Sequence, residues 1–345
     1  MHSFAQAPVA PAGKQLPRAN DKISILTFGS DLEPQPKPIL ASIAEEHPDL
    51  FVLLGDAVFS DETKQAPDLP GLRSAYQGLA DDAEFSTFRA SVPMIVTWDD
   101  HDYGSNDGGG DFAYKDISQK IFDHFWGYDL RHQKRKGVYD VYSFGPRGER
   151  VQIILLDTRY DRSPLTRLRG ETGDGHYAPS ENPELHMLSN KQWQWLEEEL
   201  RQPADLRVIV SSIQVLSDGH HWERWGNLPL QEEKLFRTIR DSHAKGVVLV
   251  SGDRVLGGLY RKDGLLDYPV YELTTSALNL PWKTLSGKDE SPETATGQVG
   301  TLFPRPNYGE LRIDWKTGMI TMNLKDEKGM VVRDQKISLN SLRPH

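Results

Sequence analysis

The chain contains no cysteine among its 345 residues, which excludes disulfide bonds and thiolate metal sites. No apolar run approaches the roughly eighteen residues that a membrane span requires. The formal net charge of -10 argues against nucleic acid as a main partner, because phosphate backbones attract basic surfaces. A phosphorylated substrate is not excluded, since a bound cation can reverse the local field.

The first residues are rich in alanine and proline and contain no apolar segment of the kind found in a signal peptide. We predict that residues 1–21 form a flexible segment and that residues 22–345 form one catalytic domain. The leading segment fits either the trimmed start of an exported protein or a plain flexible tail.

Short apolar runs that end at turn residues predict buried strands, and segments with helical spacing lie between many of them. The expected strands are 23–28, 50–54, 92–96, 138–144, 151–156, 208–210, 246–250 and 268–275. The expected helices are 39–46, 84–89, 112–126, 191–201 and 232–244. An antiparallel meander is expected over 308–338. This order of elements indicates a layered α/β fold.

The most acidic stretch follows the expected strand 92–96 and precedes a glycine-rich loop. It holds three carboxylates and an imidazole within four residues, at Asp99, Asp100, His101 and Asp102. In open α/β sheets, ligands bind at the carboxyl ends of strands. The alternative is a solvated acidic turn, because Asp is common in turns and caps helices well.

Several other expected strands also end in an acid or an amide. If these ends converge in one sheet, the concentrated negative charge requires a cation. Each acid alone could cap a helix or turn, but this explanation is less plausible for all of them together. An oxygen-rich cage suits hard cations such as Ca²⁺, Mg²⁺ or Mn²⁺. We therefore predict as metal ligands Asp31, Asp56, Asp99, Asp100, Asp253 and Gln214.

Two or three such cations would bind phosphoryl oxygens and lower the pKa of a bound water. The sequence therefore predicts metal-dependent hydrolysis of phosphoric mono- or diesters by a metal-activated water. Arg254, beside Asp253, is a candidate clamp for a phosphoryl oxygen. Arg159 and His221 are further candidates for substrate binding, although Arg159 could simply pair with acids and His221 could be a solvated loop residue.

Six motifs together resemble the PhoD-type alkaline phosphatases and phosphodiesterases of the calcineurin-like metallophosphatase superfamily. The likeness runs from about residue 22 to 316 and is carried by residues 55–56, 97–104, 106–107, 155–159, 211–215 and 251–254. It implies a four-layer α/β/β/α sandwich, followed here by the C-terminal meander. It also implies a centre of iron with calcium, and export by the twin-arginine route, hence a periplasmic or secreted location.

The same resemblance implies roles for individual residues. It places Asp56, Asp100, Asn106 and Asp253 near the metals, and by analogy with the superfamily it makes His101 a proton donor or an orienting group. We take His101, Asn106 and Arg254 as the catalytic candidates. Calcium is the leading metal, with iron, manganese or zinc as alternatives. The expected partner is a small phosphorylated substrate or a phospholipid.

Two positions depart from the pattern of many family members. Asp31 stands where they have a metal-binding cysteine, and Val255 stands where they have a histidine. Aspartate remains an anionic ligand, whereas valine cannot bind a metal. The alternatives to a hydrolase are a non-catalytic phosphate- or phospholipid-binding relative and a calcium-stabilised structural domain. We favour a hydrolase with oxygen ligands, because the other acidic positions are kept.

Overall fold

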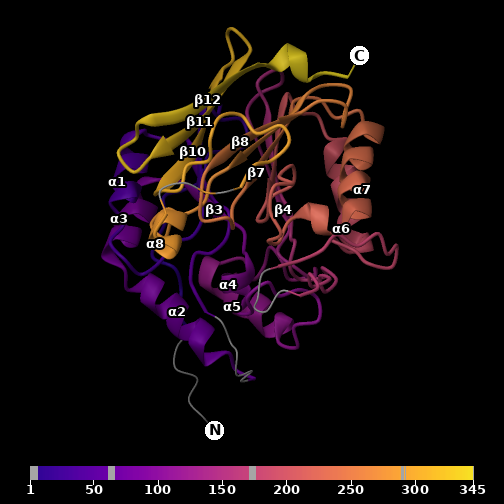
Figure 1. Cartoon of the computed structure of the whole chain (residues 1–345). Helices are drawn as coiled ribbons and strands as arrows, with labels where there is room; N and C mark the ends of the chain where they lie inside the picture. Colours follow the sequence, from indigo (N-terminus) through magenta and orange to yellow (C-terminus); the bar gives the residue numbers. More distant parts are fainter. Residues whose placement is uncertain (1–6, 61–66, 171–175, 289–290, 292, 345) are drawn as a thin grey trace.

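Two six-stranded mixed sheets form the centre of the molecule (Figure 1). The computed structural model describes residues 7–60, 67–170, 176–288, 291 and 293–344. The first sheet has the order β12-β11-β10-β1-β2-β3, and the second has the order β4-β5-β6-β7-β9-β8. Figure 1 shows α1, α2 and α3 on one side of the sheets and α6 and α7 on the other. The α/β sandwich expected from the sequence is therefore confirmed.

The strands of the first sheet are β1 (Ile25–Gly29), β2 (Leu50–Leu53), β3 (Met94–Val96), β10 (Asn307–Asp314), β11 (Met319–Asp326) and β12 (Val331–Ser338). Those of the second are β4 (Asp140–Phe144), β5 (Val151–Leu155), β6 (Leu206–Ser211), β7 (Val247–Ser251), β8 (Gly258–Lys262) and β9 (Val270–Thr274). The α-helices are α1 (Pro38–Glu45), α2 (Pro70–Ala80), α3 (Ala83–Ser91), α4 (Asp100–Tyr103), α5 (Lys115–Trp126), α6 (Asn190–Leu200), α7 (Pro229–Asp241) and α8 (Trp282–Ser286).

Strand β2 shows why these apolar runs form central strands. Val52 packs in the larger core cluster, which contains residues of both sheets, while Phe51 and Leu53 pack in the cluster that also includes residues of α1, α2 and α3. Because successive side chains of a strand point to opposite faces, a strand covered on both faces needs apolar residues throughout. The apolar run continues through the buried Leu54 and leads directly to Gly55 and Asp56.

The C-terminal meander expected from the sequence is present as β10, β11 and β12, and it extends the first sheet. Strand β1 pairs with β10 in antiparallel register, with Ile25 opposite Arg312 and Phe28 opposite Gly309. On its other edge β1 pairs in parallel with β2, and β2 with β3. In the second sheet β5, β6, β7 and β9 are parallel neighbours. Parallel neighbours bring their carboxyl ends to one edge of each sheet.

Helix α8 and three other helices or strands differ from the expectations. Helix α2 lies in a stretch for which no helix was expected, because Pro70, Gly71 and Gly78 weaken its helical pattern. The short helix α4 and the antiparallel edge strand β8 were also not expected. Among the described residues, no helix is long and apolar enough to cross a membrane.

The described part of the N-terminal segment, residues 7–21, runs against the helices beside the first sheet. The Ala10 N–H donates to the Phe125 carbonyl at 2.8 Å, and the Lys14 N–H donates to the Arg89 carbonyl at 2.8 Å. These bonds attach the segment to the ends of α5 and α3.

Candidate metal centre

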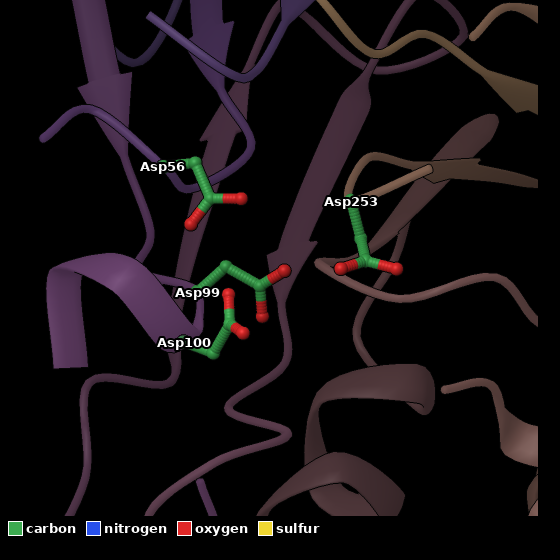
Figure 2. Close-up of side chains that lie close together, drawn as sticks. All are labelled: Asp56, Asp99, Asp100 and Asp253. Carbon is green, nitrogen blue, oxygen red and sulfur yellow. The ribbon is translucent and has the colours of Figure 1, made fainter. Parts of the chain in front are cut away.

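Four aspartates from the ends of three strands lie together between the sheets (Figure 2). Asp56 follows β2, Asp99 and Asp100 follow β3, and Asp253 follows β7. One carboxylate oxygen of each lies within 4.8 Å of the others. Asp56, Asp99 and Asp100 are buried and Asp253 is half-buried. The structure thus brings together four of the six metal ligands predicted from the sequence.

The backbone turns sharply in the loops that follow β2 and β7 and carry Asp56 and Asp253. Asp56 and Asp253 have positive φ angles of 52° and 68°, a region that Asp tolerates better than most residues. Gly55 precedes Asp56 with a φ of 110°, and an added Cβ there would lie 2.5 Å from the Cβ of Asp99. Only glycine allows the loops after β2 and β3 to approach this closely. Such strained positions concentrate at functional sites.

Asp102 holds these two loops in register. One of its carboxylate oxygens accepts hydrogen bonds from the N–H groups of Asp56 at 2.5 Å and Asp99 at 3.0 Å, and the other accepts from Ala57 at 3.0 Å. The side chain of Asp102 is fully buried. The sequence presents Asp102 as one of three equivalent acids, but its carboxylate acts on the backbone and lies outside the group of four.

Three of the four carboxylates have a raised pKa, and only that of Asp100 is lowered, because its burial is outweighed by the charges of His101 and Arg159 together with backbone hydrogen bonds. Burial and the neighbouring charge of Asp100 raise the pKa of Asp56, and burial and the charge of Asp99 raise the pKa of Asp253. Burial also raises the pKa of Asp99 to about 7, although Arg159 opposes the shift. Four oxygen donors with unfavourable mutual repulsion fit a hard divalent cation, whose charge would favour their ionised forms.

A buried ion-pair network supports Asp99 from behind. Arg159 Nε and Ser212 Oγ each donate to Asp99 Oδ1 at 2.5 Å. Arg159 also pairs with Glu223 at 2.5 Å, and Arg162 pairs with Glu223 at 2.6 Å. Asp99 Oδ2 is buried without a hydrogen-bond partner in the described part of the chain. This free oxygen, next to a fully engaged one, is what a metal ligand requires.

The network also defines the place of Arg159, a predicted substrate-binding residue. The Arg159 side chain is 0% exposed and lies between Asp99 and Glu223. In this structure it holds Asp99 and does not reach solvent. No pattern in the sequence marks Glu223 or Ser212 as its partners, because the three residues lie far apart in the chain.

His101 lies at the rim of the cluster. Its backbone N–H donates to Asp100 Oδ1 at 2.9 Å and to Asp56 Oδ1 at 3.3 Å, while its ring packs on Phe59 with centroids 4.4 Å apart. The side chain is 24% exposed, with Nε2 4.0 Å from Asp100 Oδ1. Burial alone would lower the pKa of His101, but the charges of Asp100 and Asp31 outweigh it and raise the pKa. The imidazole can therefore carry a proton beside the carboxylates.

Asp31 and Gln214, the other two predicted ligands, make hydrogen bonds to residues outside the group of four. Asp31 Oδ2 accepts from Ser30 Oγ at 2.6 Å, from Ser276 Oγ and from the Ala277 N–H at 3.3 Å. The amide of Gln214 donates to Tyr260 and Thr274, and its oxygen lies 2.8 Å from His220 Nε2. The group of four does not include Asp31. Its charge nevertheless contributes to the raised pKa of Asp56.

Arg254 and Val255 follow Asp253 in the same tight loop. Arg254 is buried, pairs with Glu293 and lies over the ring of Trp222 at 5.5 Å. Its Nε has no hydrogen-bond partner in the described part of the chain. Val255 is half-buried with a φ of 52°, and its N–H donates to Ser276 Oγ at 2.7 Å. A β-branched residue is a rare occupant of that region of φ.

Two further candidates, Asn106 and His221, are exposed. Beside Asn106, the Asp107 N–H donates to Asp100 Oδ2 at 2.7 Å, and Tyr177 OH donates to the Asp107 carboxylate at 2.8 Å. The His221 carbonyl accepts from the Tyr177 N–H at 2.7 Å. Sequence reasoning missed this link through Tyr177, which ties the loops of both exposed candidates to Asp100.

Comparison with solved structures defines the fold class. A structure of PhoD matches with a TM-score of 0.69 and 17% sequence identity, covering 94% of this chain and 74% of that chain. At this identity the likeness concerns the fold alone, which is the α/β sandwich of PhoD.

Sequence comparison then defines the family. A family model described as PhoD-like phosphatase matches residues 36–255, and the chain belongs to the PhoD-like phosphatase family. Alkaline phosphatase D of Bacillus subtilis (strain 168) is 24% identical over 243 residues. The alignment covers 61% of this chain and 39% of that protein, so the chain spans about two fifths of the length of this relative.

Proposed function

We propose that the chain hydrolyses phosphoric mono- or diesters with the help of divalent cations held by Asp56, Asp99, Asp100 and Asp253. The observation that carries the proposal is the group of four close carboxylates, in which the buried Asp99 Oδ2 has no other described partner. When bound, such cations supply positive charge that binds phosphoryl oxygens and lowers the pKa of water. Membership of the PhoD-like phosphatase family supports this reading.

The residues around the cluster have complementary tasks in the proposed reaction. Arg254, held over Trp222 with a free Nε, offers a donor for a phosphoryl oxygen. His101, partly exposed at the rim, donates a proton to the departing alkoxide oxygen. Asp102 and Arg159 do not touch substrate; they fix the positions of Asp56 and Asp99.

The donor set bears on which metals bind. The four described carboxylates are hard ligands, and the chain has no cysteine, so calcium is favoured, with iron, manganese and zinc as alternatives. We propose a small phosphorylated molecule or a phospholipid as substrate and a periplasmic or secreted location, both resting on the resemblance to the family.

Chelation tests the proposal. The full chain, stripped of metals and verified by elemental analysis, should not hydrolyse a chromogenic phosphomonoester or phosphodiester, and Ca²⁺ or Mn²⁺ should restore hydrolysis. An untreated sample passed through the same exchange column is the control. Full activity of the verified metal-free protein would contradict the proposal.

A second function has its own support. Val255 offers no ligand atom where the resemblance to the family leads us to expect histidine, and one oxygen of the Asp31 carboxylate already accepts from Ser30 and Ser276. These observations favour a protein that binds phosphate or phospholipid without hydrolysing it. Metal-dependent binding of phosphate without turnover of either ester would support this function. Metal-dependent melting without phosphate binding would instead support a calcium-stabilised structural domain.

A further inference from the structure

A basic cavity lies at the end of the second sheet opposite the aspartate cluster. It has a volume of about 310 Å³ and is formed where β5, β6 and β7 begin. Strand β6 runs from this cavity to the site, because Arg207 lines the cavity and Ser212, just after β6, donates to Asp99. At about 3.3 Å per residue the two places are roughly 15–20 Å apart.

Six basic side chains and one carboxylate line this cavity, although the chain as a whole is acidic. The basic residues are Arg147, Arg150, Arg201, Arg207, His243 and Lys245. The one acid, Asp205, is already engaged: it accepts from the Arg150 N–H at 3.0 Å and from Lys245 Nζ at 3.1 Å. Arg201 also pairs with Glu197, outside the cavity. The remaining basic side chains leave the cavity with excess positive charge.

Arg207 is the buried basic side chain of the cavity, held in place by the backbone. It is 4% exposed, and its guanidinium donates only to carbonyl oxygens, those of Gln202, Ala204 and Lys245. Its Nε has no hydrogen-bond partner, and the guanidinium forms no ion pair with a described residue. Burial accordingly lowers the pKa of Arg207. The charge of Asp205, which Lys245 shares, opposes this shift only in part. A buried cation that is incompletely compensated is costly, and an anion in the cavity would offset that cost.

We propose that this cavity binds a phosphate group, remote from the aspartate cluster. A guanidinium group can donate two parallel hydrogen bonds to two oxygens of a phosphate, and the flanking Lys245 adds a point charge. Free inorganic phosphate or the headgroup of an anionic phospholipid could present this group. The inference goes beyond the proposed hydrolysis and does not depend on it.

Calorimetric titration of the full chain with inorganic phosphate, metals supplied, tests the free ion. The parent should show a binding event that weakens by about tenfold or more in the double variant Arg147→Gln/Arg150→Gln, because two charge-assisted contacts are lost. The variant Lys328→Gln/Lys336→Gln removes the same charge from an exposed hairpin and should bind like the parent. The event should persist in Asp56→Asn, which alters the aspartate cluster.

Sedimentation with phosphatidylglycerol vesicles, compared with phosphatidylcholine vesicles, tests the headgroup. If the parent binds only the anionic vesicles, and the double variant Arg147→Gln/Arg150→Gln does not, the bound phosphate group is that of a lipid. If the parent binds inorganic phosphate but not the vesicles, the ligand is the free ion. The double variant Arg147→Gln/Arg150→Gln should have the melting temperature of the parent and hydrolyse esters at the same rate. Absence of both binding events, or equal weakening in the lysine pair, would overturn the proposal.

Discussion

Arg159 Nε donates to Asp99 Oδ1 at 2.5 Å, and the other oxygen of Asp99 has no described partner. One oxygen of this carboxylate thereby binds a protein cation, and the other is the oxygen that the proposed metal site would use. The pair is fully buried and shared with Glu223, so its two functions, holding the fold and orienting a ligand, can be tested separately.

Arg159→Gln should destabilise the protein strongly. The substitution leaves Asp99 and Glu223 buried without their shared cation, and breaking a buried ion pair in this way costs about 3–5 kcal/mol. Urea denaturation measures the change in the free energy of unfolding. Arg201→Gln, which removes an exposed pair with Glu197, is the control and should cost less than about 1 kcal/mol. Equal effects of the two substitutions would show that the buried network is unimportant.

Asp56→Asn should reduce turnover by orders of magnitude and leave the fold intact. An amide offers one neutral acceptor in place of a carboxylate that neutralises a cation. If Asp56 only shapes the turn, the change should cost little, because Asn tolerates the same left-handed backbone. Turnover and metal content are measured on one preparation, with the exposed Asp21→Asn as control. Near-normal turnover would favour the purely structural role.

Val255→His should shift metal preference from Ca²⁺ toward Zn²⁺, Mn²⁺ or iron, since imidazole suits transition metals. The backbone at this position is strained, with a φ of 52°, so Val255→Asn is the matched control: it suits that backbone without adding an imidazole. Calorimetric metal titration and thermal unfolding of both variants provide the readout. Unchanged selectivity together with a large drop in melting temperature would mean that Val255 is a packing residue.

His132 should make stability depend on pH. Its Nδ1 lies 2.6 Å from Asp123 Oδ1, and although burial lowers the pKa, the contacts with Asp123 and Asp140 outweigh burial and raise it. The charged imidazole therefore stabilises the fold fully below about pH 6.5, the unfolded value, and this contribution is lost as pH rises through the higher folded value.

Denaturation of the parent and of His132→Gln at several pH values tests this sign. The difference in unfolding free energy between them should be about 1–2 kcal/mol larger at low pH than above the folded pKa. A difference that stays constant across that range would contradict the prediction.

Gly78→Ala should stabilise the protein by about 0.5–1 kcal/mol, because glycine inside a helix is unfavourable. Gly78 lies within α2, and an added Cβ meets nothing within 4 Å. Gly55→Ala is the opposite case, since the new Cβ would contact Asp99 and the φ is 110°. Thermal melting should therefore rise for the first variant and fall for the second. A rise for both would show that the turn after β2 is not constrained.

The aspartates at the strand ends could be predicted because two local signals coincide there. One buried apolar strand ends shortly before Asp56 and another shortly before Asp99, and the arrangement of α/β sheets brings such ends together. Asp31 carries the same local signal, yet its carboxylate turns to Ser276, which lies 245 residues away. Whether a polar residue at a strand end enters the site depends on partners that only the folded chain supplies.

For the fold as well, local sequence patterns do not predict partners that lie far apart in the chain. Apolar residues that recur every two residues indicate strands, and those that recur about every 3.6 residues indicate helices. The meander 308–338 was predicted from such patterns. That β10 pairs with β1 could not be predicted, because register across such a distance leaves no local mark. Helix α2 was missed for a different reason: its glycines reduce the very pattern that identifies helices.

The pairing of Ile25 with Arg312 has a consequence for folding during synthesis on the ribosome. One edge of β1 finds its partner only when the C-terminal strands have been made. At about 5–20 residues per second, translation of the intervening segment takes roughly 15–60 s. Throughout that time β1 exposes unpaired backbone groups that invite association with other chains. Nascent chains truncated before β10 should therefore depend on chaperones far more than the finished protein.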